Sequence, residues 1–126
     1  MNTTIKLKPT RNTPAVYLDP SRGVFKMYGR SSPENSLGFY EPIRTTLAND
    51  MAGDKLDVRI KMEYFNTSSS KCLYDLLKEI KTQKENGKDV MVRWYYEEFD
   101  EDMLEAGEDY SDLLELPFSF VEHHPK

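Results

Sequence analysis

Several kinds of residue are scarce in this 126-residue chain, and each scarcity excludes a class of protein. The single cysteine, Cys72, cannot form an internal disulfide, which fits a reducing intracellular compartment. The two histidines, His123 and His124, are adjacent near the C-terminus, and no second cluster supplies the other ligands of a metal site. We therefore expect a cytoplasmic protein that holds no metal ion and no other cofactor.

The motifs of common enzyme classes are also missing. No glycine-rich loop of the GxxxxGK[ST] type is present, which leaves a nucleotide-driven enzyme unsupported. A serine hydrolase needs a histidine base held by an orienting group, but both histidines lie in a terminal tail without one. The acidic residues 97–102 do not have the layout of a calcium loop. The sequence shows no catalytic constellation, so we expect a protein that is not an enzyme.

Hydrophobic runs are short, and positive charge is missing from the C-terminal part of the chain. No apolar run approaches the roughly 18 residues of a membrane helix, so we expect no membrane insertion. The net charge of −5 divides into +5 through Arg93 and −10 from Trp94 onward. This balance argues against binding to nucleic acid, which needs a cationic face, and permits an acidic patch that meets a basic protein partner.

The patterns that are present alternate between strand and helix. Residues 55–66, 69–85 and 89–97 predict a βαβ unit with a right-handed crossover and parallel strands. The other expected elements are an edge strand at 4–8, a hairpin of strands 15–19 and 24–30, a helix at 42–51 after a loose turn capped by Ser36, an acidic helix within 100–115 broken or bent at Gly107, and a short strand at 117–121. Together, these strands and helices predict one α/β domain over residues 1–126, with a mixed sheet of four to six strands and helices mainly on one face. We expect residues 1–13 and 122–126 to be loosely ordered.

The stretch from Lys55 to Lys71 combines a strand with a polar junction. Alternate residues predict one buried face, made of Leu56, Val58, Ile60, Met62 and Tyr64. Four hydroxyls, Thr67 to Ser70, then stand where a helix begins, at N–H groups that lack partners within the helix. These hydroxyls suit an N-terminal cap, and the same place suits a phosphate because the helix dipole favours negative charge there. The two roles are compatible.

Three separated motifs resemble the SiaC family, which consists of small bacterial regulatory phosphoproteins. They are Pro33-Glu34-Asn35-Ser36, Phe65-Asn66-Thr67-Ser68-Ser69 and Val92-Arg93-Trp94-Tyr95-Tyr96. The resemblance implies a STAS-like fold, related in architecture to anti-sigma-factor antagonists. It also implies that Thr67 is the regulated phosphosite, charged by a cognate serine/threonine kinase and cleared by a PP2C-type phosphatase. The best-known system of this family implies a further partner, a diguanylate cyclase that the unphosphorylated protein binds and activates.

We therefore predict a partner-switching protein that is phosphorylated on Thr67, with Ser68 as the second choice. The predicted partner-binding residues are Asn35, Ser36, Asn66, Ser68, Ser69 and Lys71. Asn35 and Ser36 should lie beside Thr67, because both loops should emerge at one end of the sheet. Two alternatives remain open: a constitutive interaction module in which the hydroxyls only cap the helix, and a STAS-like sensor that binds a small molecule without phosphorylation.

Overall fold

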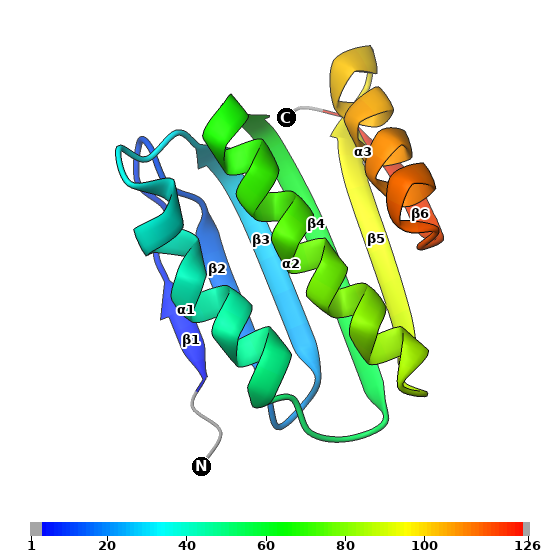
Figure 1. The fold of residues 1–126 in the computed structure, drawn as a ribbon. Helices are drawn as coiled ribbons and strands as arrows, with labels where there is room; N and C mark the ends of the chain where they lie inside the picture. The colour runs from blue at the N-terminus through cyan, green and yellow to red at the C-terminus, as the bar shows by residue number, and fades with distance from the viewer. Residues whose placement is uncertain (1–3, 125–126) are drawn as a thin grey trace.

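The structure is a computed structural model that describes residues 4–124, and it contains six strands and three helices (Figure 1). In chain order the elements are β1 (Ile5–Leu7), β2 (Ala15–Asp19), β3 (Val24–Ser31), α1 (Ser36–Asn49), β4 (Lys55–Phe65), α2 (Thr67–Glu85), β5 (Asp89–Glu97), α3 (Glu101–Leu114) and β6 (Phe118–His123). The strands lie in the sheet in the same order as in the chain. β1, β2 and β3 pair antiparallel, whereas β3, β4, β5 and β6 pair parallel.

All three helices cover one face of the sheet. Each connects a parallel strand to its next neighbour, and the strand order advances in one direction from β3 to β6. Right-handed crossovers that advance in one direction must place every helix on the same side. Figure 1 shows α1, α2 and α3 together in front of the sheet. The predicted α/β domain with a mixed sheet and helices on one face is therefore confirmed.

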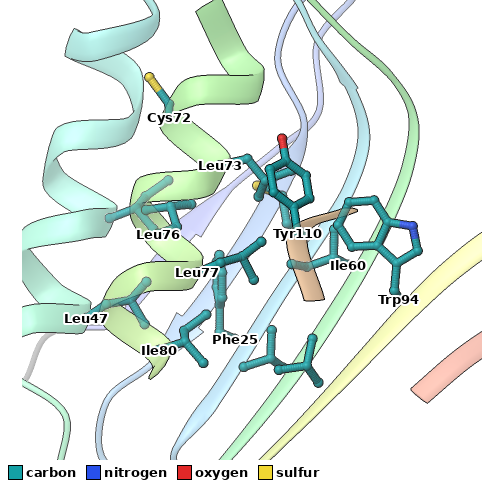
Figure 2. Close-up of a cluster of buried hydrophobic side chains, with 14 of the residues drawn as sticks. Phe25, Leu47, Ile60, Cys72, Leu73, Leu76, Leu77, Ile80, Trp94 and Tyr110 are labelled. Carbon is teal, nitrogen blue, oxygen red and sulfur yellow. The ribbon is translucent and has the colours of Figure 1, made fainter. Parts of the chain in front are cut away.

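The hydrophobic core lies between this face of the sheet and the helices. Figure 2 shows Leu73, Leu77 and Ile80 of α2 pointing toward the strands, where they are buried. Trp94 of β5 is fully buried and stacks on Phe118, with ring centroids 5.9 Å apart. Cys72 is buried on the same helix, and this burial raises the pKa of its thiol. Its ordinary role is that of a small apolar side chain.

β4 departs from strict alternation near its end. Met62 pairs with Gly29, but Tyr64 pairs with the next residue of β3, Arg30, so Glu63 is an extra residue in a bulge. Beyond Met62, the bulge therefore reverses which side chains of β4 face the core and which face the solvent. Tyr64, which we predicted to be buried, is exposed. The centroid of its ring lies 5.1 Å from the guanidinium carbon of Arg30. Phe65 instead packs against the core.

α1 also differs from the prediction. Its N-cap is Asn35 rather than Ser36, and the helix runs through Pro42 without a break. The buried positions Ser36, Tyr40, Ile43 and Leu47 follow one helical stripe. Pro42 lies on the exposed side of the helix, so its ring does not disturb this packing. The packing of the buried stripe outweighs the cost of the backbone hydrogen bond that Pro42 cannot donate. The same stripe leaves Leu37 exposed, although it precedes Tyr40 by three residues and its spacing alone is compatible with a buried position.

The predicted break at Gly107 is wrong, because α3 is continuous from Glu101 to Leu114. The glycine permits a close approach instead. A Cβ atom at Gly107 would lie 2.5 Å from Cδ1 and Nε1 of Trp94. The same indole donates its Nε1–H to the carbonyl oxygen of Met103 at 2.9 Å, which holds the helix against β5.

The termini of the described chain take part in the sheet. β1 lies within the segment 1–13 and pairs with β2, and β6 extends to His123 and pairs with β5. Within residues 4–124, no helix is both long and apolar enough to cross a membrane.

The contact between Gly107 and Trp94 yields a prediction about stability. Gly107→Ala should lower the free energy of unfolding by at least about 1 kcal/mol, because overpacking against the buried indole outweighs the roughly 1 kcal/mol gain in helix propensity. Urea denaturation measures the change. Glu108→Ala, at an exposed position of the same helix, is the control and should change stability by less than about 0.5 kcal/mol. An unchanged or increased stability of Gly107→Ala would show that the close approach does not matter.

Candidate functional site

The N-termini of α1 and α2 meet at one edge of the sheet. Both helices follow parallel strands, so each begins where a strand reaches its carboxyl end (Figure 1). The two strand ends are held together because the N–H of Asn66 donates to the carbonyl oxygen of Ser31 at 3.0 Å. The two helix ends are held together by the hydroxyls of Ser36 and Ser68, whose oxygens are 2.8 Å apart. The structure therefore brings Asn35 and Ser36 to the start of α2, as the loop argument predicted.

An asparagine caps each of these helices. The Asn66 Oδ1 accepts the Ser69 N–H at 2.9 Å and the Ser68 hydroxyl at 3.2 Å. The Asn35 Oδ1 accepts the Gly38 N–H at 3.0 Å. α2 thus begins at Thr67, two residues earlier than we predicted, and none of the four hydroxyls is its N-cap. Asparagine satisfies the same free N–H groups as serine or threonine would, so the cap does not occupy the hydroxyls.

Three of the four hydroxyls at the start of α2 have partners. Ser68 bonds to Ser36 and Asn66 as described above. Ser69 is fully buried and accepts from the Ser31 hydroxyl at 2.7 Å. The Ser70 hydroxyl lies 2.8 Å from the Tyr110 hydroxyl, which connects α2 to α3.

The Thr67 side chain is exposed, and its hydroxyl has no hydrogen-bond partner in the part of the chain that the structure describes. It stands at the first position of α2, where the helix dipole concentrates positive potential. Of the four hydroxyls, it is the one on an exposed side chain that has no partner among residues 4–124, so an enzyme could reach it without breaking a hydrogen bond. A phosphate added here would break no hydrogen bond among residues 4–124.

The buried hydroxyls beneath Thr67 form an uncharged network. The Tyr40 hydroxyl lies 2.5 Å from that of Ser31, which in turn bonds Ser69. Burial raises the pKa of Tyr40 to about 12, although its hydrogen bond with Ser31 acts in the opposite direction. Burial also raises the pKa of Tyr110. Both tyrosines therefore stay neutral at physiological pH, Tyr40 within this network and Tyr110 beside Ser70.

One cation stands beside Thr67. Lys71 follows it by four residues, which places both side chains on the same face of α2. The Lys71 ammonium is exposed and lies 3.8 Å from the Asp75 carboxylate. An exposed pair at this distance contributes little to stability. Lys71 is accordingly free to turn toward an anion on Thr67.

The structure assigns different surroundings to the predicted partner-binding residues. Asn35, Asn66, Ser68 and Lys71 are exposed or half-buried, whereas Ser36 and Ser69 are buried. Burial leaves these two serines in contact with other residues of the chain, where they position the turn, and removes them from direct contact with a partner in this conformation. Our sequence reasoning missed Leu37, which is 70% exposed directly beside Ser36. The spacing of positions 36, 40, 43 and 47 is the signal that separates Leu37 from the buried stripe.

The site has no feature of a metal centre. Across residues 4–124, no group of three or more His, Cys, Asp or Glu side chains is arranged to hold a metal ion. His124 pairs through its Nδ1 with the Glu98 carboxylate, far along the chain from Thr67.

Comparisons with known proteins agree with this geometry. Residues 7–123 match the family model of the SiaC family regulatory phosphoproteins. An uncharacterized protein of Pseudomonas aeruginosa (strain UCBPP-PA14) is 29% identical over 116 residues, which covers 90% of this chain and 92% of the relative.

Two solved structures share the fold over nearly the whole chain. SiaC of Pseudomonas aeruginosa is 26% identical with a TM-score of 0.83, covering 98% of this chain and 99% of that one. A crystal structure of the diguanylate cyclase SiaD in complex with its activator SiaC, also from Pseudomonas aeruginosa, matches with 29% identity and a TM-score of 0.86, covering 94% and 99%. The fold is therefore SiaC-like, and the match with the family model places the protein among regulatory proteins rather than enzymes. The chain belongs to the SiaC family of regulatory phosphoproteins.

Proposed function

We propose that this protein is a partner-switching regulator that is phosphorylated on Thr67, and that its unphosphorylated form binds and activates a diguanylate cyclase. The observation that carries the proposal is the exposed hydroxyl of Thr67 at the joined N-termini of α1 and α2. The partner is suggested by the relative SiaC, which is the activator in a complex with the cyclase SiaD. Activation of the cyclase would raise the production of cyclic di-GMP, and phosphorylation would lower it.

The switch acts through local charge. A phosphate adds nearly two negative charges and three acceptor oxygens to the first turn of α2. The N–H groups of that turn, the helix dipole and Lys71 all favour it in the free protein. A partner that covers this turn would have to bury the dianion, at a cost of several kcal/mol when the charge has no partner. Such a cost is enough to weaken binding by about a hundredfold or more.

The docking surface in this proposal consists of the exposed residues around the joined helix ends. Asn35, Leu37, Thr67 and Lys71 are exposed there. Leu37 supplies apolar area, which a partner buries favourably, while Thr67 supplies the position at which charge is added. Ser36 and Ser69 support this surface from beneath.

Two enzymes complete the proposed cycle. A cognate serine/threonine kinase adds the phosphate, and a PP2C-type phosphatase removes it. Both need access to the same side chain, and Thr67 offers it. Ser68 is the second choice because it is exposed, but phosphorylating it would break its bond with Ser36 and so separate the two helix ends.

The small-molecule sensor, the second alternative from the sequence, would be favoured by a deep and closed apolar pocket. One hollow has a volume of about 880 Å³ and includes Tyr28, Lys61 and Tyr95 in its lining. It lies on the face of the sheet opposite the helices and is open to solvent. The core on the helix side is filled by buried side chains. We therefore prefer the phosphoswitch.

The phosphosite can be tested directly. In protein purified from its native host and analysed by phosphopeptide mass spectrometry, we expect phosphate on Thr67. Thr67→Ala should abolish the modification, whereas Ser68→Ala should retain it, because Ser68 is not the acceptor. No phosphate on residues 67 to 70 under any growth condition would favour the constitutive interaction module.

The charge mechanism is tested by partner binding. With Thr67→Ala and Thr67→Asp as baits in a lysate of the native host, Thr67→Ala should retain a diguanylate cyclase. Thr67→Asp should retain less of it, because the added charge would have to be buried. The aspartate should reproduce the phosphorylated state only in part, since it has less charge and fewer oxygens than phosphate.

The matched control is Thr82→Asp, which makes the same change of charge at an exposed position near the other end of α2. It should bind the cyclase as the wild-type protein does. Equal binding by Thr67→Ala and Thr67→Asp would show that charge at Thr67 does not control the partner. A loss of binding in Thr82→Asp as well would point to an effect of net charge alone.

A further inference from the structure

The face of the sheet opposite the helices carries a row of positive charges. We call it the cation row and define it as Lys6, Lys26, Arg59 and Arg93. Lys6 pairs with Tyr17, Tyr17 with Lys26, Lys26 with Arg59, and Arg59 with Arg93, so the row crosses five neighbouring strands at directly paired positions. The strand neighbours of these residues, such as Val58 and Ile60 beside Arg59, point into the core, which places the row on the outer face.

Like charges at paired positions repel one another across a sheet. Neighbouring groups compensate these positive charges only in part. The carboxylate of Asp57 forms ion pairs with two guanidinium groups, with N–O distances of 3.2 Å to Arg59 and 3.0 Å to Arg93. The ammonium groups of Lys6 and Lys26 lie 5.8 and 6.0 Å from the ring centroid of Tyr17. Asp57 and Tyr17 offset part of this repulsion, and a further anion at the row would reduce it more.

A hollow of about 470 Å³ lies over the middle of the cation row. Its lining consists of Tyr17, Arg22, Val24, Lys26, Asp57 and Arg59. Three cations thus face one carboxylate, in a chain whose net charge is −5. The volume is within the range of small-molecule sites.

A buried donor at this hollow also lacks an acceptor. The Nε of Arg59 is buried and has no hydrogen-bond partner among the residues that the structure describes. Buried polar atoms in proteins are nearly always paired, so this Nε can donate to an acceptor oxygen of a bound anion or of water. Arginine and lysine together are the side chains that bind phosphate groups, through the flat guanidinium and the compact ammonium.

We propose that this hollow binds a small phosphorylated metabolite. Three cations against one carboxylate leave two positive charges in the lining, which a phosphate group with nearly two negative charges balances. Arg22, Lys26 and Arg59 are the residues that hold the phosphates. The site lies near the start of β4 on the outer face, whereas Thr67 follows the end of β4 beside the helices, so this binding is independent of the proposed phosphoswitch.

Isothermal titration calorimetry of the full chain tests this site, with pyrophosphate and ATP as probes. The double variant Arg22→Gln/Lys26→Gln removes two cations from the lining and keeps Arg59 with Asp57. The control, Lys78→Gln/Lys84→Gln, removes two exposed lysines from α2 and so makes the same change of net charge. Wild-type and control proteins should bind with affinities within about twofold of each other, and the pocket variant should bind at least about tenfold more weakly, because two charge-assisted contacts are lost.

The two probes separate the sources of phosphate. Similar affinities for pyrophosphate and ATP would support recognition of the phosphates alone, and tighter binding of ATP would support a nucleotide. Urea denaturation of each variant shows that it is folded. Two outcomes would overturn the proposal: neither probe binds the wild-type protein, or the control loses as much affinity as the pocket variant. If both probes fail, binding of a glutamate-rich peptide would assign this face to an acidic protein partner instead.

Discussion

The direction in which the strands advance through the sheet is the constraint on which the rest of the structure depends. Because β3, β4, β5 and β6 follow one another as parallel neighbours, each right-handed crossover places its helix on the same face and starts it at the same edge. The N-termini of α1 and α2 therefore stand together, and their partial positive charges add at one place. The bond between Ser36 and Ser68 fixes their spacing. A charge added at this edge would consequently act on a surface built from two helices.

The hydroxyls around this edge divide into buried and exposed groups with different physical roles. Ser31, Tyr40 and Ser69 form a buried network that burial keeps neutral, so it holds the start of α2 in place without introducing charge. Thr67 stands above that network, exposed to solvent. Since the anchoring hydroxyls are buried and Thr67 is exposed, the proposed phosphorylation would change the charge of the surface while the packing beneath it is kept. This separation suits the reversible switch that we propose.

The sequence was informative wherever a local pattern decided the outcome, and it failed where tertiary contacts did. Strand alternation and helical spacing located the βαβ unit, the hairpin and the acidic helix. The bulge at Glu63 could not be predicted, because one extra residue depends on the partner strand. Pro42 and Gly107 both looked like breaks, yet packing along α1 and against Trp94 overrode their propensities. At the site, the motif located the hydroxyls. Only the structure shows that Asn66 caps the helix and that the Thr67 hydroxyl has no hydrogen-bond partner between residues 4 and 124.

The acidic charge of α3 limits how the proposed switch at Thr67 can work. α3 carries six acidic and no basic residues, and it contacts the start of α2 through Tyr110. In the proposed switch, a basic partner would therefore be attracted to this side of the molecule whether or not Thr67 is phosphorylated. One phosphate would change a net charge of −5 only modestly, and salt screens its field beyond about 8 Å at physiological ionic strength. A change in long-range attraction would consequently not release the partner. The proposed switch would have to act within contact distance, where a partner that covers Thr67 would strip water from the phosphate. For that reason the location of the hydroxyl would matter more than the total charge.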